Sequence, residues 1–227
     1  MLGFLNQALY LVLYLILDHF LSKINIHGSV PYFDKFNSVV RLLILLFLYD
    51  CIMYWCHYLF HAFNFTRKVH NVHHVENSMD AMTAIRLHFF EYIAFSVAAI
   101  ILFYTFAATT NERIIIIVIS QVFSAYTHAD FRLPYKIEMI LDKIFVTSGY
   151  HMHHHSNNTK EANENFGLIF NLWDRINKTY HRPEKGRIYQ YGTRTDEEAS
   201  NSLVKNLFLL LPYDKGAGLR GYKHKKV

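Results

Sequence analysis

The chain contains four long apolar stretches separated by polar segments, and this pattern limits its possible folds more than any other feature. The stretches cover residues 4–21, about 42–60, 89–108 and 114–126. As a helix that rises about 1.5 Å per residue, the second stretch would be roughly 28 Å long, close to the hydrocarbon thickness of a bilayer. Charged residues make up only 18% of the chain, below the level of about a quarter in soluble domains. We therefore predict an all-α integral membrane protein with about four membrane-associated helices.

Basic residues near the ends of these stretches predict the orientation in the membrane, because Lys and Arg gather on the cytosolic side. Lys23, Lys35 and Arg113 lie on one side of the predicted bundle. The larger group on the other side comprises Arg67, Lys68, Arg86, Arg132, Lys136 and Lys143. The 63–88 loop and the region after residue 130 are therefore predicted to face the cytosol. The expected location is a bacterial inner membrane or the endoplasmic reticulum, with several passes through the bilayer.

We interpret the chain as a single domain over residues 1–227. It divides into an N-terminal membrane helix and loop (1–36), a core that carries the histidines (37–183) and a cytosolic tail region (184–227). The fourth apolar stretch is short for a complete span and is expected to tilt, to be partly buried or to form one arm of a hairpin. Residues after 130 are expected to form a helical cap on the cytosolic side.

The formal net charge of +5 does not indicate nucleic-acid binding. No basic stripe with interleaved stacking aromatics is present, and the cationic residues lie mainly after residue 130, which favours a face beside anionic lipid headgroups. Cys51 and Cys56 are five residues apart in an apolar stretch and point to different sides of a helix, so they are not expected to pair. We predict a membrane and no nucleic acid as the surroundings of this protein.

Fifteen histidines are present, and most of them fall into three groups. Residues three or four apart lie on one face of a helix, close enough for their side chains to reach one cation. Neutral imidazole is a common metal ligand. The groups are His57 and His61, then His70, His73 and His74, then His151, His154 and His155. Eight rings exceed the four ligands of a tetrahedral site, so the sequence predicts two metal ions. The residues alone do not distinguish zinc, copper, iron and nickel, because imidazole binds all four.

Further short motifs follow the same order along the chain. Residues 50–57 read D-C-I-M-Y-W-C-H, 68–74 read K-V-H-N-V-H-H, and 86–91 read R-L-H-F-F-E. Later come H-A-D-F-R-L-P at 128–134, N-F-G at 165–167 and W-D-R at 173–175. With the histidine groups, residues 45–183 resemble the fatty acid hydroxylase and sterol desaturase superfamily of membrane di-iron enzymes. Tyr58, Phe89, Asp130 and the segment 177–179 depart from the usual pattern, but no histidine of the three groups is replaced.

The resemblance implies which residues form the site. His128, at the end of the fourth apolar stretch, is added as a ninth candidate because ionisable residues within the membrane are usually functional. His153 is excluded, since it lies about 200° around a helix from His151. His19, His27, His181 and His224 are expected to be ordinary surface or interface residues. The predicted metal ligands are His57, His61, His70, His73, His74, His128, His151, His154 and His155, and the predicted partners that orient them are Asp50, Asn77, His88, Glu91, Asp130 and Asn157.

The resemblance also implies two iron ions, with zinc as a possible replacement, and oxygen-dependent hydroxylation of a lipid or another long-chain apolar substrate. Electrons are expected from an external protein, because no haem-attachment or iron–sulfur motif is present. The pattern G-x-G-x-x-G at 216–221 has no helix after it and is not expected to bind a nucleotide. Desaturation or ether-lipid monooxygenation is the alternative within the superfamily. A membrane protein that binds or handles zinc is the alternative without catalysis.

Overall fold

The computed structural model describes residues 2–23 and 30–192, and the statements below concern these segments. Within them the chain forms helices and short 3-10 turns, and extended pairing is limited to two isolated bridges, so the all-α prediction is confirmed. His27, His224, the glycine segment 216–221 and the tail from residue 193 lie outside the described residues. The α-helices are α1 Leu2–Lys23, α2 Ser38–Ala62, α3 Asn64–His74, α4 Phe89–Thr105, α5 Thr110–His128, α6 Tyr135–Leu141, α7 Ser148–His154 and α8 Leu172–Asn177.

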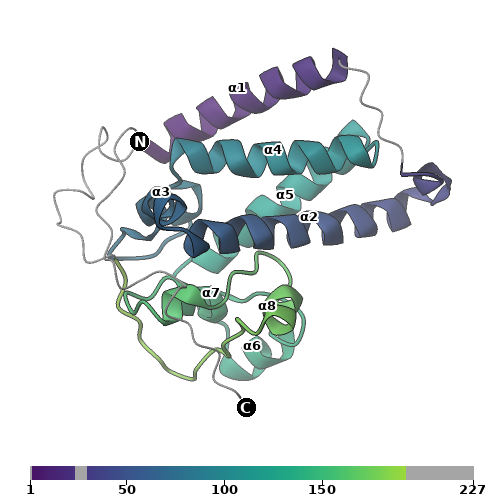
Figure 1. Cartoon of the computed structure of the whole chain (residues 1–227). Coiled ribbons are helices and arrows are strands. Elements are labelled where there is room, and N and C mark those ends of the chain that lie inside the picture. Colours follow the sequence, from purple (N-terminus) through teal and green to yellow (C-terminus); the bar gives the residue numbers. More distant parts are fainter. Residues whose placement is uncertain (1, 24–29, 193–227) are drawn as a thin grey trace.

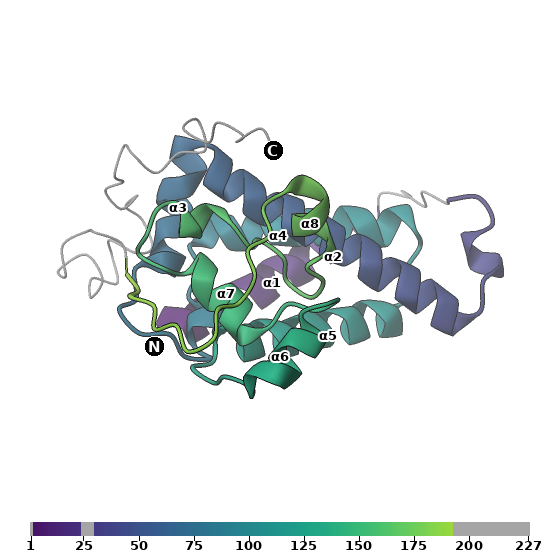
Figure 2. The same cartoon turned by 90° about the horizontal axis from the view of Figure 1, so that it is seen from below.

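Four long helices run beside one another and correspond to the four apolar stretches (Figure 1). The helix α4 lies between α1 and α2, while α3 sits at the C-terminal end of α2. The short helices α6, α7 and α8 form a cap against the bundle, with α8 beside α2 and α6 beside α5 (Figure 2). Among the described helices, α2 is long and apolar enough to cross a membrane, and α4 is a shorter apolar helix. How many of the four helices cross the bilayer stays a prediction.

Polar side chains fix where the long helices begin. Asn37 accepts a hydrogen bond from the Val40 amide in front of α2, which satisfies one of the free amides of its first turn. Thr109 and Glu112 form a reciprocal capping box at the start of α5. His88 and Glu91 do the same at the start of α4. The last pair also matters for the site, because Glu91 touches a histidine ring.

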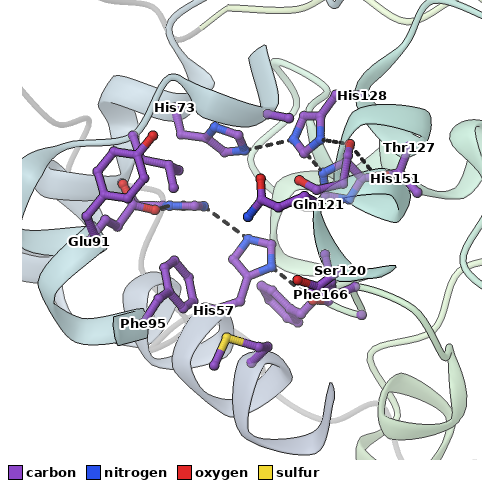
Figure 3. Close-up of a pocket in the computed structure, with 18 of the residues that line it drawn as sticks. His57, His73, Glu91, Phe95, Ser120, Gln121, Thr127, His128, His151 and Phe166 are labelled. Atoms are coloured by element: carbon purple, nitrogen blue, oxygen red, sulfur yellow. Dashed lines mark hydrogen bonds and ion pairs between the residues drawn. The ribbon is translucent and has the colours of Figure 1, made fainter. Parts of the chain in front are cut away.

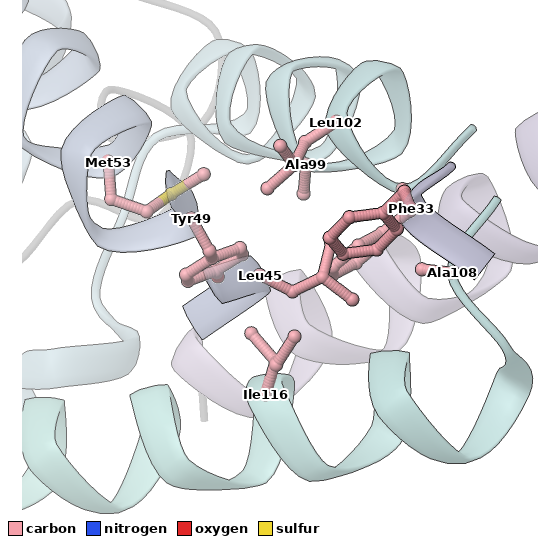
Figure 4. Close-up of a cluster of buried hydrophobic side chains, with 9 residues drawn as sticks. Phe33, Leu45, Tyr49, Met53, Ala99, Leu102, Ala108 and Ile116 are labelled. Carbon is pink, nitrogen blue, oxygen red and sulfur yellow. The ribbon is translucent and has the colours of Figure 1, made fainter. Parts of the chain in front are cut away.

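Packing of α2 against α4 and α5 forms the principal apolar core (Figure 4). Leu45, Tyr49 and Met53 follow one another at four-residue spacing on α2 and therefore share one face of that helix. This face meets Phe103 of α4 and Ile116 of α5, both fully buried. The core holds the C-terminal ends of α2 and α5 beside each other, and the site is built at those ends.

The outer surface of the bundle is apolar. Val39, Leu43 and Phe47 are exposed at four-residue spacing on α2, and Trp55 and Leu59 continue this exposure toward the C-terminal end. Such a face would be costly in water and is the surface that a helix presents to lipid. It supports the interpretation of α2 as a membrane helix.

Two ion pairs join the helix ends that lie away from the cap. Arg41 of α2 contacts Glu112 of α5 through two nitrogen atoms, at 2.8 Å and 3.0 Å. Arg113 Nη1 contacts Asp18 Oδ1 of α1 at 2.6 Å, and Tyr104 Oη donates to the Asp18 carbonyl at 2.8 Å. These contacts fix α1 and α2 relative to the α4–α5 hairpin.

Candidate metal centre

The nine predicted ligands form two groups of buried imidazoles. In each group the nearest nitrogen atoms of all members lie within 4.8 Å of one another. The helices α2, α3, α5 and α7 supply the rings, so segments far apart in the sequence meet here. The first group contains His57, His61, His70, His74 and His154, and the second contains His73, His128, His151 and His155.

Helix geometry explains how each H-x-x-H-H motif contributes to both groups. In α3, His70 and His74 are four residues apart and belong to the first group, while His73 turns toward the second. At α7 the assignment is reversed, since His151 and His155 belong to the second group and His154 to the first. The two adjacent histidines of each motif thus serve different groups, which places the groups side by side.

Hydrogen bonds to one nitrogen of a ring determine which nitrogen keeps its lone pair. In the first group, His57 Nδ1 donates to the Phe166 carbonyl at 2.9 Å, and His70 Nδ1 donates to Glu91 Oε1 at 2.5 Å. A neutral imidazole has one N–H, so Nε2 of both rings carries a lone pair. These two Nε2 atoms face each other at 3.0 Å. Two facing lone pairs repel unless a cation lies between or beside them.

The second group repeats this arrangement. His73 Nδ1 faces the Arg86 carbonyl at 3.3 Å, and His128 Nδ1 donates to the Ser124 carbonyl at 2.7 Å. The Nε2 atoms of these rings therefore keep their lone pairs and lie 2.9 Å apart. His151 Nε2 approaches His128 Nε2 at 3.0 Å. Three nitrogen atoms therefore meet in two contacts, and the contact between His73 and His128 has no hydrogen atom between its nitrogens.

Other ring nitrogens of the two groups are buried without any hydrogen-bond partner among the described residues. They are His61 Nε2, His74 Nε2, His154 Nε2, His155 Nε2 and His151 Nδ1. Buried polar atoms are normally satisfied, so unpaired atoms concentrated at one place indicate a missing ligand. Imidazole nitrogens in this number fit a pair of transition-metal ions such as zinc or iron. The donor set therefore fits the metal centre that the sequence predicts.

His61 is the exception among the nine rings. Its Nδ1 lies against an amino group of the Arg67 guanidinium, which can only donate. Nδ1 therefore accepts, and the ring proton falls on Nε2, which faces the other histidines. Arg67 itself is held by Asn163 Oδ1 at 2.7 Å. A metal at this position requires that Arg67 move away from the ring or that His61 stay outside the ligand set.

Burial keeps the imidazoles of α3 and α7 in the neutral form. It lowers the pKa of His70, His73 and His74 well below the ordinary value, and neighbouring histidines add to this effect. The pKa values of His151, His154 and His155 are lowered for the same reason. At neutral pH these rings therefore carry free lone pairs and no charge that would repel a cation.

The six predicted orienting residues have different surroundings. Glu91 contacts a ligand ring, as described above. Asp50 accepts from the Ile169 amide at 2.8 Å and from Trp173 Nε1 at 2.8 Å, and so holds the loop after α7 rather than an imidazole. His88 caps α4, and its Nε2 is buried without a partner in the described part of the chain. The remaining three, Asn77, Asp130 and Asn157, are exposed.

His153 lies outside both groups, where its Nε2 contacts Glu164 Oε2 at 2.8 Å. With His181 these residues make a third cluster of possible metal-binding groups. The two rings are nearly parallel, at 5° and with centroids 4.0 Å apart. Lone pairs in parallel ring planes cannot converge on one ion, so we assign no metal to this cluster. Hydrogen bonding to Glu164 raises the pKa of His181.

A cavity of about 120 Å³ opens beside both groups on the side of the long helices (Figure 3). Five ligand candidates form its inner end: His57 and His70 of the first group, and His73, His128 and His151 of the second. Tyr49, Met53 and Phe95 continue the lining toward the apolar core. A molecule in this cavity would therefore contact imidazoles of both histidine groups.

Comparison with known proteins agrees with this arrangement. The family model for fatty acid hydroxylases matches residues 42–179, which include all nine predicted ligands. The chain belongs to the fatty acid hydroxylase family. The resemblance inferred from the motifs is thereby confirmed.

Two curated relatives are sterol-modifying enzymes by name. A C-4 methylsterol oxidase of Schizosaccharomyces pombe is 25% identical over 179 residues, which cover 75% of this chain and 58% of the relative. The human lathosterol oxidase is 26% identical over 157 residues, which cover 69% of this chain and 50% of the relative. The chain thus spans about half the length of the curated relatives it matches. No solved structure matches it.

Several residues that orient the site were not identified from the sequence. The carbonyl groups of Phe166, Arg86, Ser124 and Glu164 face ligand rings, and main-chain atoms leave no residue-type signal. Asp174 was visible only as part of the family's W-D-R motif. It accepts from the amides of Phe166 at 2.8 Å and Gly167 at 2.7 Å, and so fixes the loop whose carbonyl orients His57.

Proposed function

We propose that this protein is a membrane-bound di-iron oxidoreductase that uses O2 and externally supplied electrons to hydroxylate a lipid-like substrate. The observation that carries this proposal is the convergence of unprotonated imidazole nitrogens from four helices, with Nε2 atoms of His57 and His70 facing each other at 3.0 Å. Membership of the fatty acid hydroxylase family supports iron as the metal. The same arrangement would accept zinc, because imidazole binds both metals.

Iron, when bound, would supply the redox chemistry that activates oxygen for attack on a C–H bond. The residues of this chain would do the rest. The histidines of the two groups would hold the metals, with His61 taking part only if Arg67 moves away from its ring, while Glu91 and the carbonyls of Phe166, Arg86 and Ser124 keep rings in position. Burial of the rings under the α6–α8 cap excludes water. One oxygen atom would enter the substrate and the other would leave as water, which consumes two electrons and two protons.

The cavity supports a lipid-like substrate that enters from the membrane. Its lining is apolar at Met53 and Phe95, and its inner end consists of histidines from both groups. A sterol or a long-chain lipid would place one carbon beside the metals and leave the rest of its skeleton along α2 and α4. The names of the relatives favour sterols within this class. Desaturation is the second candidate reaction, because hydroxylation and desaturation differ by small changes in how the substrate is placed.

We further propose that the site faces the cytosol and receives electrons from a separate protein. The sequence contains no motif for haem attachment or an iron–sulfur cluster, which motivates an external donor. Lys136 lies in the first turn of α6, Lys143 follows this helix, and both are candidate contacts for an acidic carrier. Turnover that stays unchanged after reversal of both charges would contradict this docking site.

The decisive experiment combines metal analysis with product analysis. The purified protein should contain about two iron ions per chain and consume oxygen on reduction, and cells that express it should contain a lipid heavier by one oxygen atom. The His154→Ala variant should lose both the oxygen consumption and the oxygenated lipid product. Stoichiometric zinc without oxygen consumption in the wild-type protein would favour the alternative of a metal-handling protein. A product lighter by two hydrogens would identify a desaturase.

A further inference from the structure

The cap lies beside the middle of α2 rather than beyond its end. Asp50, the central residue of α2, accepts from the amides of Ile169 and Phe170 at 2.8 Å and 3.2 Å, and from Trp173 Nε1 at 2.8 Å. One helical turn earlier, the ring of Phe47 packs on Trp173 with centroids 4.7 Å apart. The loop after α7 and the start of α8 therefore lie at the level of Phe47 and Asp50 (Figure 2).

The length of α2 shows how deep this level is. The helix has 25 residues and is therefore about 38 Å long, with Asp50 about 18 Å from either end. Wherever a hydrocarbon layer about 30 Å thick lies along an upright helix of this length, its edges are at least about 10 Å from Asp50. Backbone amides at such a depth need a partner within the protein, because no water reaches them. The Asp50 carboxylate is that partner for Ile169 and Phe170.

The outward side of the cap is apolar. Ile137, Ile140 and Leu141 are exposed on α6, and their three- and four-residue spacing places them on one face of this helix. Ile176 is exposed on α8. Lys136 lies about 100° around α6 from Ile137, so it can face the cytosol while the apolar face touches acyl chains. This distribution of side chains is typical of a helix at the edge of a bilayer.

A cavity of about 380 Å³ lies between α5 and α6 and is separate from the one beside the histidines. Its lining includes Val122 and Phe123 of α5, Leu141 of α6 and Phe145, and none of its lining residues is charged. An acyl chain can fill such a space, whereas water would find few hydrogen-bond partners there. The exposed apolar surface thus continues from α5 to α6, as it does from α2 to α8.

We propose that α6 and α8 are inserted among the acyl chains of the leaflet next to the histidine groups, so that phospholipids cover their exposed apolar faces. Continuity with the apolar outer face of α2 selects lipid as the partner of these faces, because the same bilayer surrounds both. The cap is then part of the body embedded in the membrane, rather than a layer in water above it. This inference rests on the proposed membrane location of α2 and does not depend on the proposed reaction.

Quenching of a fluorescent label tests the inference in the full chain. The two native cysteines, Cys51 and Cys56, are first replaced by alanine. One exposed residue at a time then becomes the labelled cysteine, in Ile140→Cys for α6 and in Ile176→Cys for α8. Metal content and gel filtration show that each labelled protein keeps its fold.

Two further labelled positions serve as references. Leu43→Cys marks the exposed outer face of α2 and reports a lipid environment. Ile188→Cys is the same change as in the two cap variants, made at a side chain that is 92% exposed after α8, and it reports water. Each protein is placed in phosphatidylcholine vesicles, and the quencher is either a doxyl group on the lipid acyl chain or iodide in the buffer.

The labels at Ile140 and Ile176 should lose as much fluorescence to the doxyl lipid as the label at Leu43, and iodide should not reach them. Iodide quenching at either position as strong as at Ile188 would place that helix in water and overturn the inference. Protection from both quenchers would mean that a second copy of the chain covers the face, which also overturns it. In both cases a Leu43 label quenched by the doxyl lipid would leave the proposed function intact. If the Leu43 label also behaves like the one at Ile188, the membrane location of α2 fails together with the inference.

Discussion

Five of the nine predicted ligand rings are oriented by an oxygen atom that their Nδ1 contacts. Main-chain carbonyls take this role for His57, His73, His128 and His154, and a carboxylate takes it for His70. A donor N–H held in this way fixes both the tautomer and the direction of the ring. Among these partners only the carboxylate belongs to a side chain, so only this partner can be removed by a single substitution.

Replacement of Glu91 by glutamine should weaken metal binding about 10- to 100-fold, the usual effect of losing a partner that orients a ligand. The amide keeps the size of the side chain but offers His70 Nδ1 a neutral acceptor in place of the carboxylate, which lies at 2.5 Å. Competition with a chelator measures the affinity. Glu112→Gln is the matched control, because Glu112 is also buried but contacts Arg41 at the far end of the bundle. Equal affinities in both variants would contradict the role of Glu91.

Asp174→Asn should destabilise the protein by about 1–3 kcal/mol, because the new amide group faces amides that need an acceptor. Asp174 is fully buried and also accepts from Thr179 Oγ1 at 2.7 Å and from Tyr150 Oη. Since the Phe166 carbonyl would shift with its loop, the metal content should fall as well. Thermal unfolding and metal analysis measure the two effects. The same change at exposed Asp130 should alter neither, and a stable, fully loaded Asp174→Asn protein would show that the loop does not depend on this carboxylate.

At the scale of the elements, the long helices α2 and α5 carry three of the nine predicted ligands, and the segments of α3 and α7 carry the other six. In α3 and at α7, the residues four apart join one group and the third histidine joins the other. The packing of Leu45, Tyr49 and Met53 against α4 and α5 keeps the helix ends that support these groups together. The opposite ends depend on ion pairs.

The Arg41–Glu112 pair should contribute to the stability of the bundle but not to metal binding. The side chains of the pair are 11% and 9% exposed, so Arg41→Met leaves a largely buried carboxylate without its partner. We expect a loss of about 3 kcal/mol, the lower end of the range for buried pairs. Arg41→Met/Glu112→Gln should recover part of it, because the unpaired charge is removed. Unfolding in detergent, followed by circular dichroism, measures the difference. A double variant less stable than Arg41→Met would contradict this explanation.

At the scale of the whole molecule, the two histidine groups join the long helices to α3 and to the cap. The rings come from α2 and α5 on one side and from α3 and α7 on the other. Binding that occurs only in the folded state stabilises that state. Without metal, the facing lone pairs would instead push these elements apart.

Removal of the metals by a chelator should therefore loosen the cap before the bundle. Hydrogen exchange should increase in α3 and α7, whereas the packed halves of α2, α4 and α5 around Leu45 and Phe103 should stay protected. Mass spectrometry of peptides measures the exchange, and readdition of iron should reverse the change. Equal increases throughout the chain would mean that the metals stabilise the fold as a whole rather than the joint between cap and bundle.

The sequence by itself determined the helical class, the nine histidines and the family. Apolar stretches and i, i+4 spacing are local patterns, and ligand side chains are residue types that can be recognised one by one. His153 could be set aside on helix geometry alone, and the structure places it outside both groups. The number of membrane spans and the role of each ligand remain predictions.

Only the tertiary structure decided how the histidines divide into two groups and what orients them. The division depends on the relative rotation of α3 and α7, which packing sets and which no local pattern encodes. The orienting atoms are mostly carbonyl oxygens, and these are the same in every residue. Asp50 lies on the same helix face as His57, yet it holds the loop at Ile169, because the fold brings that loop against the middle of α2.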